Sequence, residues 1–96
     1  MYYIFAIEMF SVPEGVKIEL SCLLTDPVET LSEANKKFNK AIEFSKKENI
    51  ACGLFSGGRW LEVWAVGKIN LEFKKYLNET LRPKSGKSYT VLDVGI

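Results

Sequence analysis

The sequence predicts a two-layer α+β sandwich, a ferredoxin-like variant with about five mostly antiparallel strands and two helices on one face. Apolar and polar residues alternate over short stretches, which is typical of half-buried strands. Two longer stretches repeat apolar residues with helical spacing and begin with capping residues. The resulting order is β-β-α-β-β-α-β, and its last six elements match the ferredoxin-like order. With 96 residues, the chain is expected to form a single domain over residues 1–96.

Two strands joined by a tight turn are predicted at the start of the chain. Residues 2–10 alternate between the two faces of a strand. Pro13 and Gly15 favour a turn after this strand. Every second side chain over residues 16–24 is apolar, from Val16 to Leu24, and these side chains are expected to face the core.

A long helix is predicted next. Asp26 can cap it, Pro27 suits the first helical position, and Glu29 would complete a capping box. The helix is expected to end near Glu48, and its lysines pair with acids at helical spacing on a solvated face. Its apolar stripe consists of Leu31, Ala34, Phe38, Ala41, Ile42 and Ser45.

The stretch from residue 50 to residue 66, IACGLFSGGRWLEVWAV, predicts a β-hairpin with many aromatic side chains. Gly57 and Gly58 suit a two-residue turn that needs positive φ. With Ser56 opposite Arg59, uninterrupted pairing would place Cys52, Leu54, Leu61 and Val63 on one face. The other face would carry Phe55, Trp60, Glu62 and Trp64.

A shorter helix and a last strand are predicted after the hairpin. Asn70 can cap the helix, and Pro83 would end it. Residues 82–87 contain a basic turn, and residues 88–96 are expected to form the final strand. The helix face would carry Phe73, Tyr76, Leu77, Thr80 and Leu81, and the strand would bury Thr90, Leu92, Val94 and Ile96.

If both helices cover the aliphatic face, alternation sends a mixed aromatic and acidic set of side chains to the outer face of the sheet. Three large aromatics there would rival the largest apolar patch usual on a monomer. Three kinds of group could cover this face: loops and neighbouring side chains, a protein partner such as a second copy of the chain, or single-stranded nucleic acid. The candidate partner-binding residues are Phe55, Trp60, Glu62, Trp64, Glu8 and Tyr89.

The sequence offers little catalytic chemistry. It contains no histidine, so neither a Ser-His-Asp nor a Cys-His site can be built from it. Cys22 and Cys52 are too few for a zinc site and are expected to be free thiols. The PKSGKS stretch at residues 83–88 lacks the first glycine of a phosphate-binding loop. We therefore expect no enzymatic activity, cofactor or metal ion; an active site would require Glu8, Glu19, Glu62 and Asp93 to cluster.

The expected function is a small cytoplasmic protein–protein interaction module, for example a phage-encoded inhibitor or modulator of a host protein. Carboxylates among aromatic rings favour a partner with a basic surface, because lysine and arginine gain both ion pairs and cation–π contacts. A homodimer through the same face is a further possibility, and no membrane contact is expected. The alternative is single-stranded nucleic-acid binding through the lysine-bearing helices and the 82–87 turn. The net charge of +1 and the scarcity of arginine weigh against this alternative.

Overall fold

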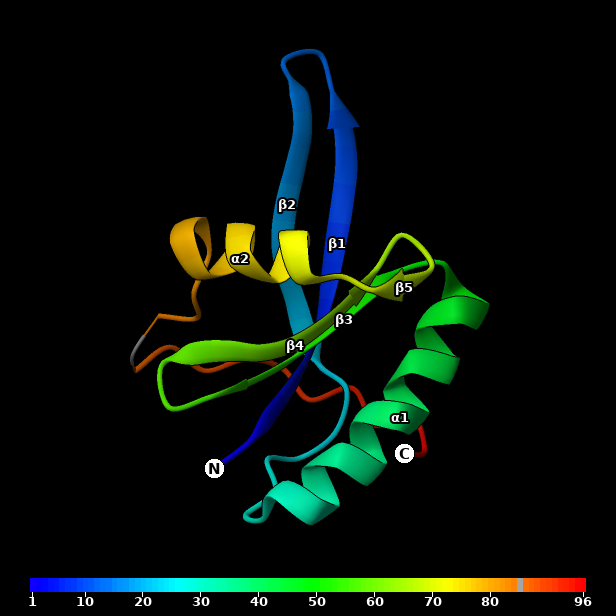
Figure 1. Cartoon of the computed structure of the whole chain (residues 1–96), viewed down its shortest axis with the longest axis vertical. Helices are drawn as coiled ribbons and strands as arrows, with labels where there is room; N and C mark the ends of the chain where they lie inside the picture. Colours follow the sequence, from blue (N-terminus) through cyan, green and yellow to red (C-terminus); the bar gives the residue numbers. More distant parts are fainter. Residues whose placement is uncertain (85) are drawn as a thin grey trace.

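The computed structural model describes residues 1–84 and 86–96 and shows a small α+β domain with one five-stranded antiparallel sheet. The predicted α+β class, the N-terminal strand pair, the central hairpin and both helices are confirmed. Figure 1 shows the β1–β2 hairpin rising along the longest axis of the molecule. The elements are β1 (Tyr3–Val12), β2 (Gly15–Leu23), α1 (Leu31–Glu48), β3 (Ala51–Ser56), β4 (Arg59–Ala65), β5 (Lys68–Ile69) and α2 (Leu71–Thr80).

The strand order is β2-β1-β3-β4-β5, and every neighbouring pair is antiparallel. Strand β1 therefore lies between β2 and β3, which run parallel to each other and are connected by α1. The ferredoxin-like variant is not the observed arrangement, because β1 lies between β2 and β3 and residues 88–96 form no regular strand.

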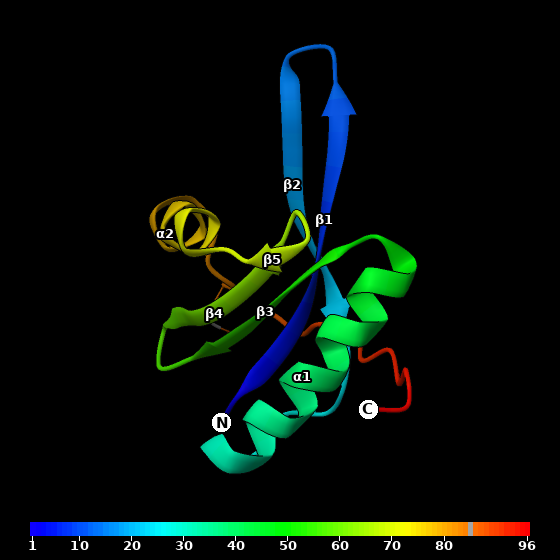
Figure 2. The same cartoon turned by 45° about the vertical axis from the view of Figure 1, so that its right-hand side comes forward.

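The two helices cover opposite faces of the sheet. An α1-side cluster contains Phe38 of α1 together with Ile4, and an α2-side cluster contains Leu77 of α2 together with Phe5. Since Ile4 and Phe5 are neighbours in one strand, their side chains point to opposite faces. Figure 2 shows the two helices separated by the strands. The prediction of two helices on one face is therefore wrong, and the strands are apolar on both faces because both faces are covered.

A β-bulge in the β3–β4 pair changes which side chains share a face. Phe55 lies opposite Trp60 as predicted, but the next pair is Leu54 with Glu62, so Leu61 is an extra residue in β4. The extra residue moves the side chains that follow it to the other face of the sheet. Val63 therefore packs in the α2-side cluster and Trp64 in the α1-side cluster, the reverse of the prediction.

A second irregularity does the same in the β1–β2 pair. Ala6 pairs with Cys22, whereas the next residue, Ile7, pairs with Leu20. Cys22 consequently packs on the α1 side, and Ile18 and Leu20 pack on the α2 side. The single inward face predicted for residues 16–24 is wrong, because the register shift divides the strand between the two clusters.

Helix α1 begins later than predicted. Thr30 is its N-cap, and the Thr30 hydroxyl accepts a hydrogen bond from the Glu33 N–H at 3.2 Å. Residues 26–27 lie outside the helix. Val28 is 6% exposed and exchanges two backbone hydrogen bonds with Tyr2, at 2.8 and 3.0 Å. Burial and these two bonds favour extended backbone at Val28, which removes Asp26 from the capping position.

Residues 88–96 do not form the predicted strand. Their backbone pairs with the sheet at one isolated bridge, where the Leu23 N–H donates to the Thr90 carbonyl at 2.9 Å and the Leu92 N–H donates to the Leu23 carbonyl at 2.8 Å. Tyr89 packs on the α2-side cluster, but Val94 and Ile96 pack on the α1-side cluster. The tail therefore passes from one face of the sheet to the other beside the end of β2. The fifth strand of the sheet is instead β5, which the sequence did not predict.

Candidate functional site

The two tryptophans expected to anchor a partner are core residues. Trp60 is 1% exposed, and its indole Nε1 donates to the Leu81 carbonyl at 2.8 Å. Trp64 is 8% exposed and packs in the cluster on the opposite face. The predicted aromatic and acidic sheet face does not exist, because the bulge at Leu61 sends the two rings to opposite faces and each face is covered.

The structure distributes the other four candidate residues over three places. Phe55 and Tyr89 are half-buried and line one groove. Glu8 lines a second groove, to which Trp64 also contributes atoms. Glu62 is exposed and lines neither groove. The structure therefore brings Phe55 together with Tyr89 in one groove and Glu8 together with Trp64 in another. The six candidate residues do not share one surface.

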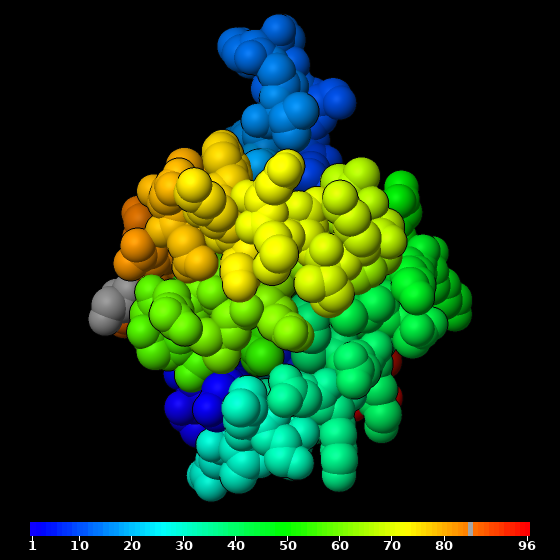
Figure 3. All heavy atoms as spheres, in the orientation of Figure 1, coloured from blue at the N-terminus to red at the C-terminus, as the bar shows by residue number. Residues whose placement is uncertain are grey.

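The most prominent surface feature is an arm, defined as residues 8–20 of the β1–β2 hairpin. Strand β1 pairs with β3 only as far as Ile7, and among the described residues positions 8–12 pair with β2 alone. Figure 3 shows the arm projecting beyond the packed body of the protein. Met9 and Phe10 are each 41% exposed and Val16 is 66% exposed. The arm therefore presents apolar side chains and an unpaired strand edge outside the core.

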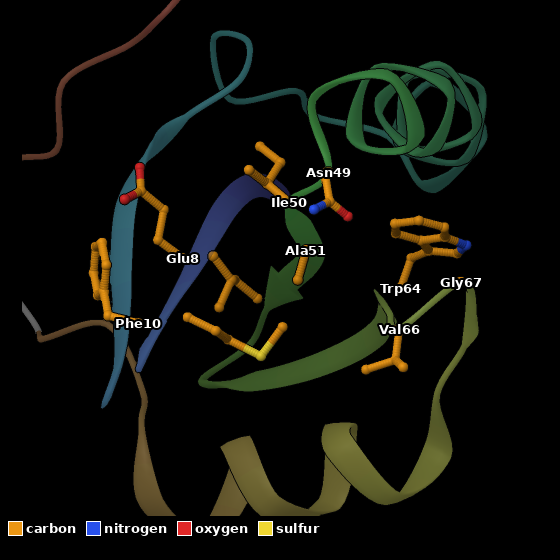
Figure 4. Close-up of a pocket in the computed structure, with 10 residues that line it drawn as sticks. Glu8, Phe10, Asn49, Ile50, Ala51, Trp64, Val66 and Gly67 are labelled. Carbon is orange, nitrogen blue, oxygen red and sulfur yellow. The ribbon is translucent and has the colours of Figure 1, made fainter. Parts of the chain in front are cut away.

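An edge groove of about 430 Å³ lies along the unpaired side of β1 at the base of the arm. Figure 4 shows Glu8 and Phe10 on one side and Trp64 and Val66 on the other. Strand β3 begins at Ala51, so the groove occupies the line that β3 would follow if it continued beside the arm. The lining residues are Ile7, Glu8, Met9, Phe10, Asn49, Ile50, Ala51, Trp64, Val66 and Gly67.

Val66, at the rim of the edge groove, has a strained backbone. Its φ is +54°, and Gly67 follows with φ +79° in the turn between β4 and β5. The left-handed region is unfavourable for a β-branched residue, at about 1–2 kcal/mol. Val66 is also 79% exposed, so burial of its side chain does not offset the strain. Such an outlier motivates a functional hypothesis for the surface that carries it.

The arm is acidic. Glu8 lies directly opposite Glu19 in the β1–β2 register. Lys17 Nζ is 2.8 Å from Glu19 Oε1, and this carboxylate, as hydrogen-bond acceptor and opposite charge, raises the pKa of Lys17. With Glu14 near its tip, the arm has three carboxylates and one ammonium group, and its net charge is −2.

The second groove, which we call the aromatic cleft, has a volume of about 610 Å³. The half-buried rings of Tyr3, Phe55 and Tyr89 line it together with the exposed side chains of Arg82 and Lys87. It therefore joins two features that the sequence analysis assigned to different functions, namely the aromatic residues and the basic turn.

Neither cysteine forms a disulfide in the structure. Both are free thiols, and Cys52 is fully buried. Burial raises the pKa of the Cys52 thiol to about 11, and the Ser45 hydroxyl beside it offsets only part of this rise. The thiol is consequently protonated at neutral pH.

Within residues 1–84 and 86–96, no three His, Cys, Asp or Glu side chains are placed to hold a metal ion. Neither described helix is long and apolar enough to cross a membrane.

Sequence reasoning missed Met9, Phe10 and Val66 as surface residues. A usable signal was strand length, because a strand can pair only along the length of its neighbour. The ten-residue β1 exceeds the six-residue β3, so part of it must extend past that neighbour. The strained backbone at Val66 could not be predicted from the sequence. Valine is rare in the left-handed region, so a valine gives no reason to expect this conformation.

The chain matches no protein-family model, no curated protein and no solved structure. The arm, the edge groove and the aromatic cleft are the features of the structure that bear on function.

Proposed function

We propose that this protein is a non-enzymatic binding module that takes an extended segment of a partner protein along residues 8–12 of β1. The observation that carries the proposal is the unpaired β1 edge beside the edge groove. An extended segment that adds to a strand edge gains main-chain hydrogen bonds, and its alternate side chains enter neighbouring pockets.

Two other open edges of the sheet, along β2 and along residues 59–63 of β4, carry charges or a covering side chain, which supports a special role for this edge. On β2, the paired charges of Lys17 and Glu19 lie along the arm. On β4, the Asn78 side chain of α2 accepts from the Trp60 N–H at 2.7 Å and donates to the Trp60 carbonyl at 3.2 Å. Charges and covering groups are common means of preventing unwanted strand addition. Residues 8–12 carry a single charge, Glu8.

The proposed partner segment is basic and partly apolar. Lysine or arginine side chains would meet the net charge of −2 on the arm. Apolar side chains would meet Met9, Phe10 and Val66, and methionine adapts well to varied contact surfaces. Contacts made by Val66 on binding would offset its backbone strain. Binding without turnover is the action of an inhibitor or modulator, and two free cysteines suit a reducing compartment such as the cytoplasm.

Site-specific photo-crosslinking in cells tests this proposal. A photoreactive amino acid at position 10 should form an adduct with a protein partner, whereas the same group at Asn39, exposed on α1, should not. An adduct between two copies of the chain would identify the partner as a second copy. Adducts of the same pattern from both positions, or none from position 10, would contradict the proposal.

Matched substitutions then measure how much the arm contributes. Phe10→Ser should weaken capture of the crosslinked partner about tenfold, as expected for an aromatic anchor. Tyr76→Ser removes a ring that is 48% exposed on α2 and should leave capture unchanged. An equal loss for the two variants would assign binding to a surface other than the arm.

A further inference from the structure

The aromatic cleft surrounds one buried ring with three partly open ones. Phe5 is 2% exposed, and its ring centroid lies 5.0 Å from that of Tyr89 and 6.4 Å from those of Tyr3 and Phe55. Phe55 also contacts the Trp60 ring, with centroids 5.1 Å apart. The open rings are therefore backed by buried aromatic side chains. The volume of about 610 Å³ falls within the range of small-molecule sites.

Cations from the basic turn line the same cleft. These are Arg82, Lys84 and Lys87, and all three are exposed. In the part of the chain that the structure describes, none of the three forms an ion pair and no carboxylate lines the cleft. The edge groove is the opposite case, since Glu8 is its charged residue. The aromatic cleft therefore favours an anionic ligand.

Hydrogen bonds and a cation–π contact position the basic turn beside the rings. Arg82 Nε donates to the Asn78 carbonyl at 2.8 Å, which fixes the guanidinium against the last turn of α2 and leaves its Nη donors for a ligand. The Lys84 N–H donates to the Tyr89 hydroxyl at 3.4 Å. Lys87 Nζ lies 5.2 Å from the centroid of the Tyr89 ring. The charges and the rings thus form one surface.

We infer that the aromatic cleft binds a nucleotide unit, with the base against the open rings and the phosphate near Arg82 and the two lysines. Aromatic faces stack on any base, and guanidinium and ammonium groups bind phosphate. An acidic peptide could use the cations, but only its aromatic residues would cover the rings, whereas every nucleotide carries both a phosphate and a planar base. A free nucleotide and a single-stranded nucleic acid share this chemistry. The cleft is separate from the arm, so the inference does not depend on the proposed function.

Binding assays on the whole chain test the inference and distinguish the two sources. The probes are AMP, measured by calorimetry, and fluorescein-labelled oligothymidylate, measured by anisotropy. Binding of AMP identifies a free-nucleotide site, and binding of the oligonucleotide alone identifies a single-strand site. In either case Phe55→Leu should weaken binding about tenfold. Lys84→Gln should weaken it and reduce its salt dependence. Lys40→Gln, an exposed lysine on α1, should change neither quantity.

Several outcomes would overturn the inference. One is the absence of binding by both probes, and another is an equal loss for Lys40→Gln and Lys84→Gln. A third is competition by pyrophosphate or polyglutamate as strong as that by AMP, because the rings would then contribute nothing. Since Phe55 is half-buried, thermal unfolding of Phe55→Leu must show an intact fold. Lys84→Gln changes an exposed side chain and keeps the test decisive if Phe55→Leu fails to fold.

Discussion

At the scale of single residues, Gly53 is required by a close contact within the sheet. A Cβ at this position would lie 2.6 and 2.8 Å from the Cζ3 and Cε3 atoms of Trp60 and 3.2 Å from the Cδ1 atom of Ile7. The indole cannot move aside easily, because it is 1% exposed and hydrogen-bonded to Leu81. We expect Gly53→Ala to lower the free energy of unfolding by about 1–3 kcal/mol, measured by urea denaturation.

A double-mutant cycle tests the cause of this loss. Trp60→Phe replaces the indole by a smaller ring, so Gly53→Ala should cost less in the Trp60→Phe protein than in the parent. An unchanged cost would show that contact with the indole is not the reason for glycine at this position.

Cys52 makes the stability of the protein depend on pH. Its pKa is raised by burial from an ordinary value of 9.0 to about 11. The unfolded chain therefore releases the thiol proton first as the pH rises. The stabilisation that this group contributes is complete below about pH 9 and is lost as the pH rises towards 11. The free energy of unfolding of Cys52→Ala should fall less over this interval, and parallel curves for the two proteins would contradict the prediction.

At the scale of secondary-structure elements, Asn78 joins α2 to β4. Its side-chain amide bonds to both backbone groups of Trp60, as a neighbouring strand would do. Asn78→Ala leaves these two groups without their partner, and we expect a loss of roughly 2–4 kcal/mol in the free energy of unfolding. Asn39→Ala, on the exposed side of α1, should change it by less than about 0.5 kcal/mol. Similar losses for the two variants would refute the role assigned to Asn78.

The two helices differ in whether their first residue depends only on neighbours in the sequence. The α2 start was predicted, since the Asn70 side chain accepts from the Phe73 N–H at 3.0 Å, a bond that spans three residues. The α1 start was not, because Asp26 was predicted as the cap, whereas Thr30 is the residue that caps the helix. The choice depends on Val28, whose backbone bonds to the distant Tyr2.

At the scale of the whole molecule, the protein divides into a packed body and an arm. Phe5 and Phe10 belong to the same strand, but Phe5 is 2% exposed and Phe10 is 41% exposed. We expect Phe5→Ala to cost about 3–5 kcal/mol, as for other buried phenylalanines. Phe10→Ala should cost less than about 1 kcal/mol, because Phe10 belongs to neither cluster. Urea denaturation compares the two variants directly, and equal costs would mean that the arm belongs to the folded core.

The sequence by itself determined the features that depend on interactions within a few residues. These are the turn at Gly57 and Gly58, both with positive φ, the cap at Asn70, and the alternation that identifies the strands. Phe55 and Tyr89 line one groove, but the strand predicted to carry Tyr89 does not form. Only the tertiary structure decided which face of the sheet each side chain occupies. One extra residue in β4, Leu61, places Trp60 and Trp64 on opposite faces. The physical reason is that side chains in a strand alternate with a period of two, so a single bulge reverses every position after it.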